Sequence, residues 1–143
     1  MSKDILIPID AQKPELADKA LKIAISQARE SGGELHVMTV VPGFNMPMVA
    51  AYFPADAMEN ALKAVEKKLH HYIDTHIPDD LSSCLHVTNG NPYKQIIKMA
   101  KQINASMIVI PSRKQSSVDE ALIGSVAGKV VERASCSVLV IRD

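Results

Sequence analysis

Short apolar runs alternate with longer amphipathic segments along the chain. The runs lie at residues 4–9, 35–41, 84–90, 106–110 and 137–142. Runs of this length that are apolar at almost every position are typical of strands covered on both faces, as in a parallel sheet. The pattern therefore predicts five buried strands.

Helical spacing of apolar residues marks the segments between these runs. Pro14 suits a first helical position, and Gly32-Gly33 ends the helix that it opens. The apolar face of this helix is formed by Leu16, Ala20, Ile23, Ala24 and Ala28. A second helix, ended by residues 77–80, carries Met58, Leu62, Val65, Leu69, Tyr72 and His76 on one face.

Two shorter helices complete the pattern. Asn91 and Pro92 suit the N-cap and the first position of a third helix. The face of this helix is formed by Ile96, Ile97, Ala100 and Ile103. The amphipathic segment 126–134 predicts a fourth helix.

The resulting order, β-α-β-α-β-α-β-α-β, predicts an α/β three-layer sandwich. We expect a five-stranded parallel sheet with four helices over its two faces. A length of 143 residues suits a single domain, residues 1–143. Ligands in such sheets bind beyond the carboxyl ends of the strands. That edge would hold Asp10, the segments 38–43 and 89–91, and the loop 111–125.

Composition narrows the expected environment and partners. Lys and Arg number 16, as do Asp and Glu, so zero net charge gives no electrostatic reason to expect nucleic-acid binding. It also makes self-association easier. The N-terminal apolar run is too short for a signal peptide, and no segment approaches the ~18 apolar residues of a membrane span. Cys84 and Cys136 form no CxxC pair, and we expect a reduced, cytoplasmic protein without membrane contact.

The loop at 110–125 has the composition of a phosphate-binding segment. It carries hydroxyls and positive charges from Ser112, Arg113, Lys114, Ser116, Ser117 and Ser125. Gly124-Ser125 stands at a predicted helix start, where free backbone N–H groups and the helix dipole favour an anion. In the alternative interpretation Ser125 is only an N-cap and the loop is solvated. Spacing alone favours this alternative.

Acidic and histidine side chains offer fewer candidates. Asp10, after the first strand, could accept hydrogen bonds from ribose hydroxyls or could simply cap a turn. His70 and His71 are adjacent and so point to different sides of a helix, and His76 is not spaced to share a face with either. His36 and His86 lie in different predicted strands. We therefore expect no metal site.

Motifs that mark common catalytic centres do not occur in the sequence. It has no G-x-S-x-G, H-E-x-x-H, G-x-x-x-x-G-K-[ST] or G-x-G-x-x-G segment. Asp119 and Glu120 are adjacent acids, which are more often solvated than paired for acid–base chemistry. No catalytic residue is predicted.

A methionine-rich stretch at 42–58 is the remaining candidate. Its apolar residues are Met46, Met48, Val49, Tyr52, Phe53 and Met58. They could form a flexible lid or a partner surface, because methionine adapts to irregular contacts. They could equally pack back onto the sheet.

Four stretches together resemble the universal stress protein family (UspA superfamily). They are ILIPID (5–10), ELHVMTVVP (34–42), TNGNPYKQIIKMAKQINASMIVIPSR (88–113) and LIGSVAGKVVERASCSVLVIR (122–142). The resemblance covers essentially the whole chain and looks closest to the small F-type bacterial branch. It implies a Rossmann-like fold with strand order 3-2-1-4-5.

The resemblance also implies a nucleotide site. The family's ATP-binding loop, G-x2-G-x9-G-[ST], falls on this chain with Pro111 and Lys114 at the first two glycines and Gly124-Ser125 at the last two positions. In the F-type branch these two glycines are also commonly replaced, and nucleotide binding is still associated with it. By carry-over, Asp10 would contact the ribose and Val37 would meet adenine through its backbone, and Pro8 and Ile9 would also belong to the nucleotide-binding residues. The phosphates would be surrounded by Ile110, Ser112, Arg113, Lys114, Gly124, Ser125 and Val126.

The expected function is that of a stress-response sensor or regulator that binds ATP, with or without Mg²⁺, or a related adenine nucleotide. The resemblance implies a homodimer that pairs through the strand 137–142, with tetramers possible. Two alternatives stay open. One is a slow ATPase or kinase-like transferase using Asp10 or Asp119. The other is a nucleotide-free dimeric module that holds partners through 42–58.

Overall fold

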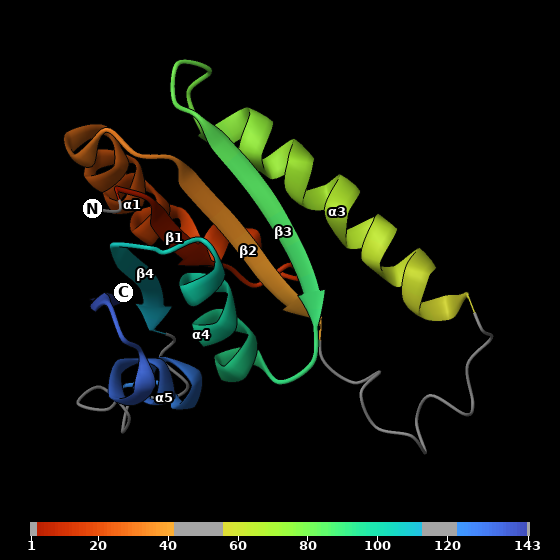
Figure 1. Cartoon of the computed structure of the whole chain (residues 1–143). Helices are drawn as coiled ribbons and strands as arrows, with labels where there is room; N and C mark the ends of the chain where they lie inside the picture. Colours follow the sequence, from red (N-terminus) through yellow and green to blue (C-terminus); the bar gives the residue numbers. More distant parts are fainter. Residues whose placement is uncertain (1–2, 42–55, 113–122, 143) are drawn as a thin grey trace.

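A computed structural model describes residues 3–41, 56–112 and 123–142 (Figure 1). The five strands form one parallel sheet in the order β3-β2-β1-β4-β5. They are β1 (Ile5–Pro8), β2 (Leu35–Val41), β3 (Ser83–Asn89), β4 (Met107–Ser112) and β5 (Ser137–Arg142). The predicted fold class and strand order are confirmed.

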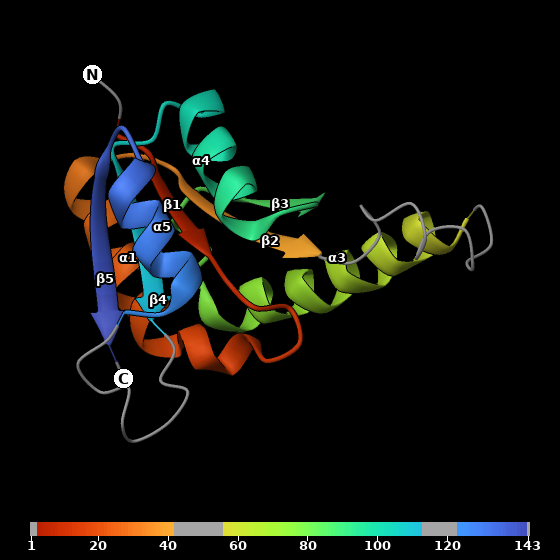
Figure 2. The ribbon, with the colours of Figure 1, turned by 90° about the horizontal axis from the view of Figure 1, so that it is seen from below.

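Helices cover both faces of this sheet. They are the 3-10 turn Pro14–Ala17 followed by α1 (Asp18–Ser31), then α3 (Ala57–His76), α4 (Pro92–Gln102) and α5 (Ser125–Arg133). Figures 1 and 2 show α1 and α3 on one side of the sheet and α4 and α5 on the other. No helix in the described part of the chain is both long and apolar enough to cross a membrane.

Local signals account for two of the helix ends. Gly32 ends α1 in the left-handed conformation, with φ 74°, and its N–H donates to the Ala28 carbonyl. The Asn91 side chain accepts the Lys94 N–H at the start of α4, as predicted. Pro14 differs from its prediction, because it opens the 3-10 turn and α1 begins only at Asp18.

Two apolar clusters hold the layers together. Leu6 and Ile7 are both fully buried although they are adjacent, because β1 is covered on both faces. Ile7 belongs to the cluster with α1 and α3, whereas Leu6 packs with Met38 and the buried residues of α4 and α5. Because side chains alternate along a strand, the residues of β2 two positions before and after Met38 face the α4 side of the sheet, as Met38 does.

Candidate nucleotide-binding site

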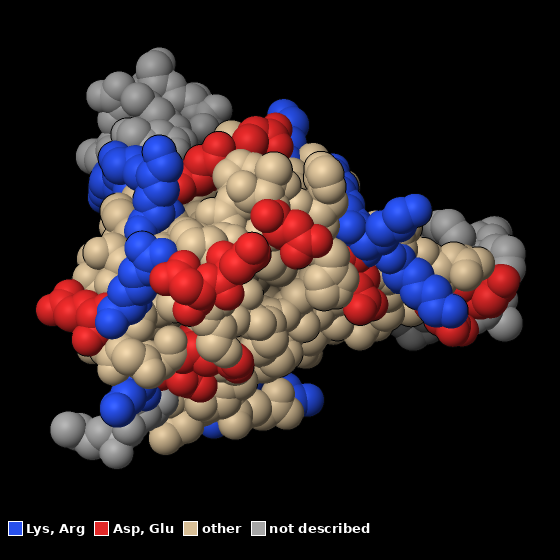
Figure 3. All heavy atoms as spheres, turned by 90° about the horizontal axis from the view of Figure 1, so that it is seen from above, with Lys and Arg blue, Asp and Glu red and all other residues tan. Residues whose placement is uncertain are grey.

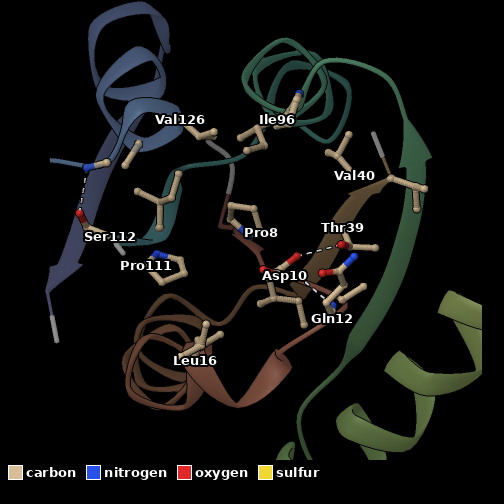
Figure 4. A pocket seen from close by; sticks show the side chains of 18 of the residues that line it. Pro8, Asp10, Gln12, Leu16, Thr39, Val40, Ile96, Pro111, Ser112 and Val126 are labelled. Atoms are coloured by element: carbon tan, nitrogen blue, oxygen red, sulfur yellow. Dashed lines mark hydrogen bonds between the residues drawn. The ribbon is translucent and has the colours of Figure 1, made fainter. Parts of the chain in front are cut away.

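A cavity of about 480 Å³ opens at the carboxyl ends of β1, β2 and β4 (Figure 4). Its walls come from these strand ends, from the segment after β1, and from the first turns of α4 and α5. In the strand order 3-2-1-4-5, chain direction across the sheet switches between β1 and β4. Parallel α/β sheets bind ligands at such a point. The volume lies within the ~300–1,000 Å³ typical of small-molecule sites.

Hydrogen bonds fix the strand ends at the floor of the cavity. The buried Thr39 hydroxyl donates to the Ile9 carbonyl at 2.8 Å, and the Ile9 N–H donates to the Met38 carbonyl at 2.8 Å. One residue further, the Asp10 carboxylate accepts the Gln12 N–H at 2.9 Å, which closes a turn (Figure 4). Asp10 is exposed, so its carboxylate stands at the solvent side of the cavity.

The start of α5 forms the opposite wall. Gly124 is the N-cap of this helix, and its N–H donates to the buried Ser112 hydroxyl at 3.2 Å. The first intrahelical bond runs from the Gly128 N–H to the Gly124 carbonyl. The N–H groups of Ser125, Val126 and Ala127 therefore precede the intrahelical ladder, and all three residues line the cavity. Such a helix end favours an anionic group.

Apolar side chains line the space between these two walls. They are contributed by β2, β4 and α4, chiefly Val40, Val41, Ile110 and Ile96. Figure 4 shows Val40 and Ile96 along one side of the cavity, Pro8 near the middle and Pro111 beside Ser112. Such walls can enclose the flat apolar ring of a ligand while a charged group of the same ligand reaches the N-terminus of α5.

Most of the predicted site residues meet at this cavity. Those that line it are Pro8, Ile9, Asp10, Ile110, Ser112, Gly124, Ser125 and Val126. Val37, which was expected to meet adenine through its backbone, is not among the lining residues, and its side chain is buried in the cluster on the α1 side of the sheet. Arg113 and Lys114 lie outside the described residues, as do 42–55 and the rest of 113–122. A role for any of these residues in binding stays a prediction.

Several lining residues were missed at the sequence level. Thr39, Val40 and Val41 fall within the segment 38–43 that was placed at this edge, but nothing singled them out. Gln12, Leu16, Val65 and Ile96 also line the cavity. The apolar ones belong to helices whose pattern marks them only as core, so the sequence carries no local signal for their role. Ser125 is the first residue of α5 rather than its N-cap, which is Gly124.

Comparison with known proteins places the chain among relatives of its own length. The family model for the universal stress protein family matches residues 1–142. Universal stress protein G of Salmonella typhimurium is 33% identical over 150 residues, covering 99% of this chain and 100% of the relative. The protein of the same name from Escherichia coli O157:H7 is 30% identical over 145 residues, with the same shares covered. The G-type branch therefore fits the chain, where the sequence had suggested the F type.

Solved structures agree on the fold. The hypothetical protein MJ0577 superimposes with a TM-score of 0.79 at 23% identity, covering 100% of this chain and 97% of that one. A universal stress protein solved in complex with cAMP gives a TM-score of 0.62 at 19% identity, with 99% and 97% covered. With the family model spanning nearly every residue, the chain belongs to the universal stress protein family.

Proposed function

We propose that this protein binds an adenine nucleotide in the cavity at the strand ends and acts as a stress-response regulator. The observation that carries the proposal is the pairing, in one cavity of about 480 Å³, of apolar walls with the open N-terminal turn of α5. The first suits a purine ring and the second suits phosphate. The cAMP complex of a protein with this fold supports the same class of ligand.

ATP is the nucleotide that the family's loop motif favours. Phosphate oxygens would accept hydrogen bonds from the first N–H groups of α5, and the Asp10 carboxylate would accept from ribose hydroxyls. Pro111 has no N–H to offer, so the phosphates depend on the α5 end of the site. A Mg²⁺ ion bound with the nucleotide would neutralise phosphate charge, and the phosphate oxygens would be among its ligands.

We also propose a homodimer formed through β5 and a location in the cytoplasm. β5 is an edge strand of the described sheet, and Ile141 is the only one of its six residues that is buried. An uncovered edge of this kind presents unpaired backbone groups that a second copy can satisfy. Pairing of dimers into tetramers would be a further step.

The identity of the ligand is tested by releasing what the protein carries. The protein is purified without added nucleotide and denatured, and the supernatant is analysed by mass spectrometry. Stripped protein is then melted with ATP, ADP, cAMP or, as a control, GTP. The proposal predicts an adenine nucleotide in the supernatant or a rise in melting temperature with adenine nucleotides but not with GTP. If no nucleotide is released and no thermal shift occurs, the proposal is contradicted, and the nucleotide-free interaction module becomes the better account of the function.

A further inference from the structure

Three metal-ligand side chains converge at the other end of β2 from the cavity. His36 is the second residue of β2 and lies in register with Cys84, the second residue of β3. His86 follows Cys84 by two positions and so points to the same face of the sheet. That face is the α4 side, because Met38 packs there and alternation places His36 with it. The nucleotide cavity, by contrast, receives Thr39, Val40 and Val41.

The donor atoms of these side chains are in mutual contact. His36 Nδ1 lies 2.9 Å from His86 Nε2 and 3.0 Å from Cys84 Sγ, and Sγ lies 3.3 Å from His86 Nε2. The two imidazole rings are nearly parallel, with an interplanar angle of 7° and centroids 5.2 Å apart, and they meet edge to edge through these two nitrogens. One nitrogen from each ring and the sulfur therefore lie within 3.3 Å of one another.

Two carboxylates fix the orientation of the innermost ligand. His36 Nε2 lies 3.0 Å from Asp4 Oδ2 and 3.3 Å from Glu34 Oε1. Asp4 is held in turn by the Glu34 N–H, at 3.0 Å, and Glu34 by the Ser82 hydroxyl, at 2.7 Å. A His whose Nε2–H is donated to a carboxylate presents its Nδ1 lone pair on the other side of the ring. This carboxylate–histidine arrangement is the one that orients metal-ligating histidines.

Burial of the cluster is graded from inside to outside. His36 is only 6% exposed, although a central strand covered on both faces usually carries an apolar residue at such a position. Cys84 and His86 are half-buried on β3, which is an edge strand of the described sheet. The innermost ligand is thus shielded from water, while the outer two are partly exposed to solvent.

We propose that His36 Nδ1, Cys84 Sγ and His86 Nε2 bind a divalent transition-metal ion, Zn²⁺ being the ion that this donor set suits best. Two imidazoles and a thiolate match the ligand preferences of Zn²⁺, and the fourth position is left to water. Bond lengths of about 2.0–2.1 Å to nitrogen and about 2.3 Å to sulfur place tetrahedral ligand atoms about 3.3–3.6 Å apart. Rotation of the two imidazole side chains would turn both nitrogens toward one ion and open the present 2.9–3.3 Å spacings to those values.

The experiment uses the whole chain without a histidine tag, treated with a chelator and titrated with Co²⁺ alone and then Zn²⁺ alone. We expect one equivalent of Co²⁺ to give a thiolate-to-cobalt charge-transfer band, which Zn²⁺ displaces. Cys84→Ser should abolish the band, and both Cys84→Ser and His86→Gln should weaken Zn²⁺ binding by more than about 10-fold. Circular dichroism establishes that each variant is folded.

Matched control variants remove a cysteine or a histidine that lies outside the proposed metal site. Cys136→Ser replaces the other cysteine, and His70→Gln replaces an exposed histidine of α3, so both should bind Zn²⁺ as the unmodified chain does. Absence of the cobalt band in the unmodified chain, or equal Zn²⁺ affinity in Cys84→Ser, would overturn the proposal and leave the cluster as a hydrogen-bonded feature. Neither result bears on nucleotide binding, since the two sites share no residue.

Asp4→Asn tests the positioning role of the carboxylate. The asparagine keeps an oxygen for the Glu34 N–H but turns an amide N–H toward His36 Nε2, which favours the tautomer protonated at Nδ1. We expect Zn²⁺ affinity to fall about 10–100-fold while the cobalt thiolate band persists at saturating Co²⁺. Unchanged affinity would show that Asp4 does not orient the ligand.

Discussion

Gly33 and Gly128 occupy opposite environments. A Cβ built at Gly33 would overlap the backbone carbonyl of Lys3, which is held there because it also accepts the Ser31 hydroxyl at 2.7 Å. A Cβ at Gly128, inside α5, would meet nothing within 4 Å. The first glycine is thus required by a close approach of two backbone segments, and the second only weakens its helix.

Alanine substitutions should therefore act in opposite directions. Gly33→Ala must push the segment just before β1 and the turn after α1 apart and is expected to lower the free energy of unfolding by about 1–3 kcal/mol. Gly128→Ala should raise it by about 0.5–1 kcal/mol through helix propensity. Urea unfolding of the two variants beside the unmodified chain measures both values. A Gly33→Ala protein as stable as the parent would contradict the described packing of the N-terminal strand.

At the scale of elements, one hydrogen bond joins the two helices on the same face of the sheet. The Tyr72 hydroxyl of α3 donates to the Asp18 carboxylate of α1 at 2.6 Å. Burial first, and then this carboxylate, raise the pKa of the Tyr72 hydroxyl above its ordinary value. The folded state therefore favours the protonated phenol.

This coupling predicts an alkaline loss of stability. Above about pH 10 an unfolded tyrosine releases its proton while Tyr72 in the folded protein keeps it, so the free energy of unfolding falls as pH rises. Tyr72→Phe should lack this contribution and should cost about 1–2 kcal/mol at neutral pH, where the bond is intact. Unfolding by denaturant at pH 7 and at pH 10.5 gives the comparison. The difference in the free energy of unfolding between the parent and Tyr72→Phe should be smaller at pH 10.5 than at pH 7. An equal difference at the two pH values would contradict this prediction.

The order of elements could be predicted because each is a local pattern. β5 was predicted at 137–142, which matches Ser137–Arg142, and the Asn91 cap of α4 follows from two adjacent residues. The cluster at His36 could not be predicted in this way, because His36 and His86 lie in separate strands that only the fold brings together. Their 2.9 Å contact depends on β2 and β3 being neighbours and on a register set by core packing. The position of the cavity could be predicted, because ligands of parallel sheets bind beyond the carboxyl ends of the strands. Its apolar walls could not, because they form only when the strands and helices pack together.

At the scale of the whole molecule, the distribution of surface charge and the exposed edge of the sheet indicate what kind of partner the protein can bind. On the face seen in Figure 3, basic and acidic side chains are interspersed rather than separated into one-sign patches. At the sheet edge, β5 carries Val138, Leu139 and Val140 in half-buried positions. Such an edge suits pairing with a second copy better than attraction of a highly charged partner.

The β5 edge gives a direct test of the homodimer. Val138→Lys places a charge on that strand, and a two-fold axis would bring two such charges near each other, so the dimer should weaken. Ala64→Lys adds the same charge on the exposed face of α3 and should leave the dimer intact. Sedimentation velocity of the three proteins reports the mass of each. A parent protein with the mass of one chain would exclude the dimer, and an unaffected Val138→Lys dimer would exclude this edge.

The central claim, that the cavity holds an adenine nucleotide against the start of α5, is tested most directly by calorimetric titration with Mg-ATP. Gly124 has φ −55° and ψ 154°, a conformation that valine also adopts, so Gly124→Val changes the phosphate wall without straining the backbone. Gly128→Ala, on the same helix but not lining the cavity, is the control. We predict saturable binding to nucleotide-free parent and Gly128→Ala proteins and none to folded Gly124→Val. Equal binding by all three, or no binding by the parent, would contradict the account.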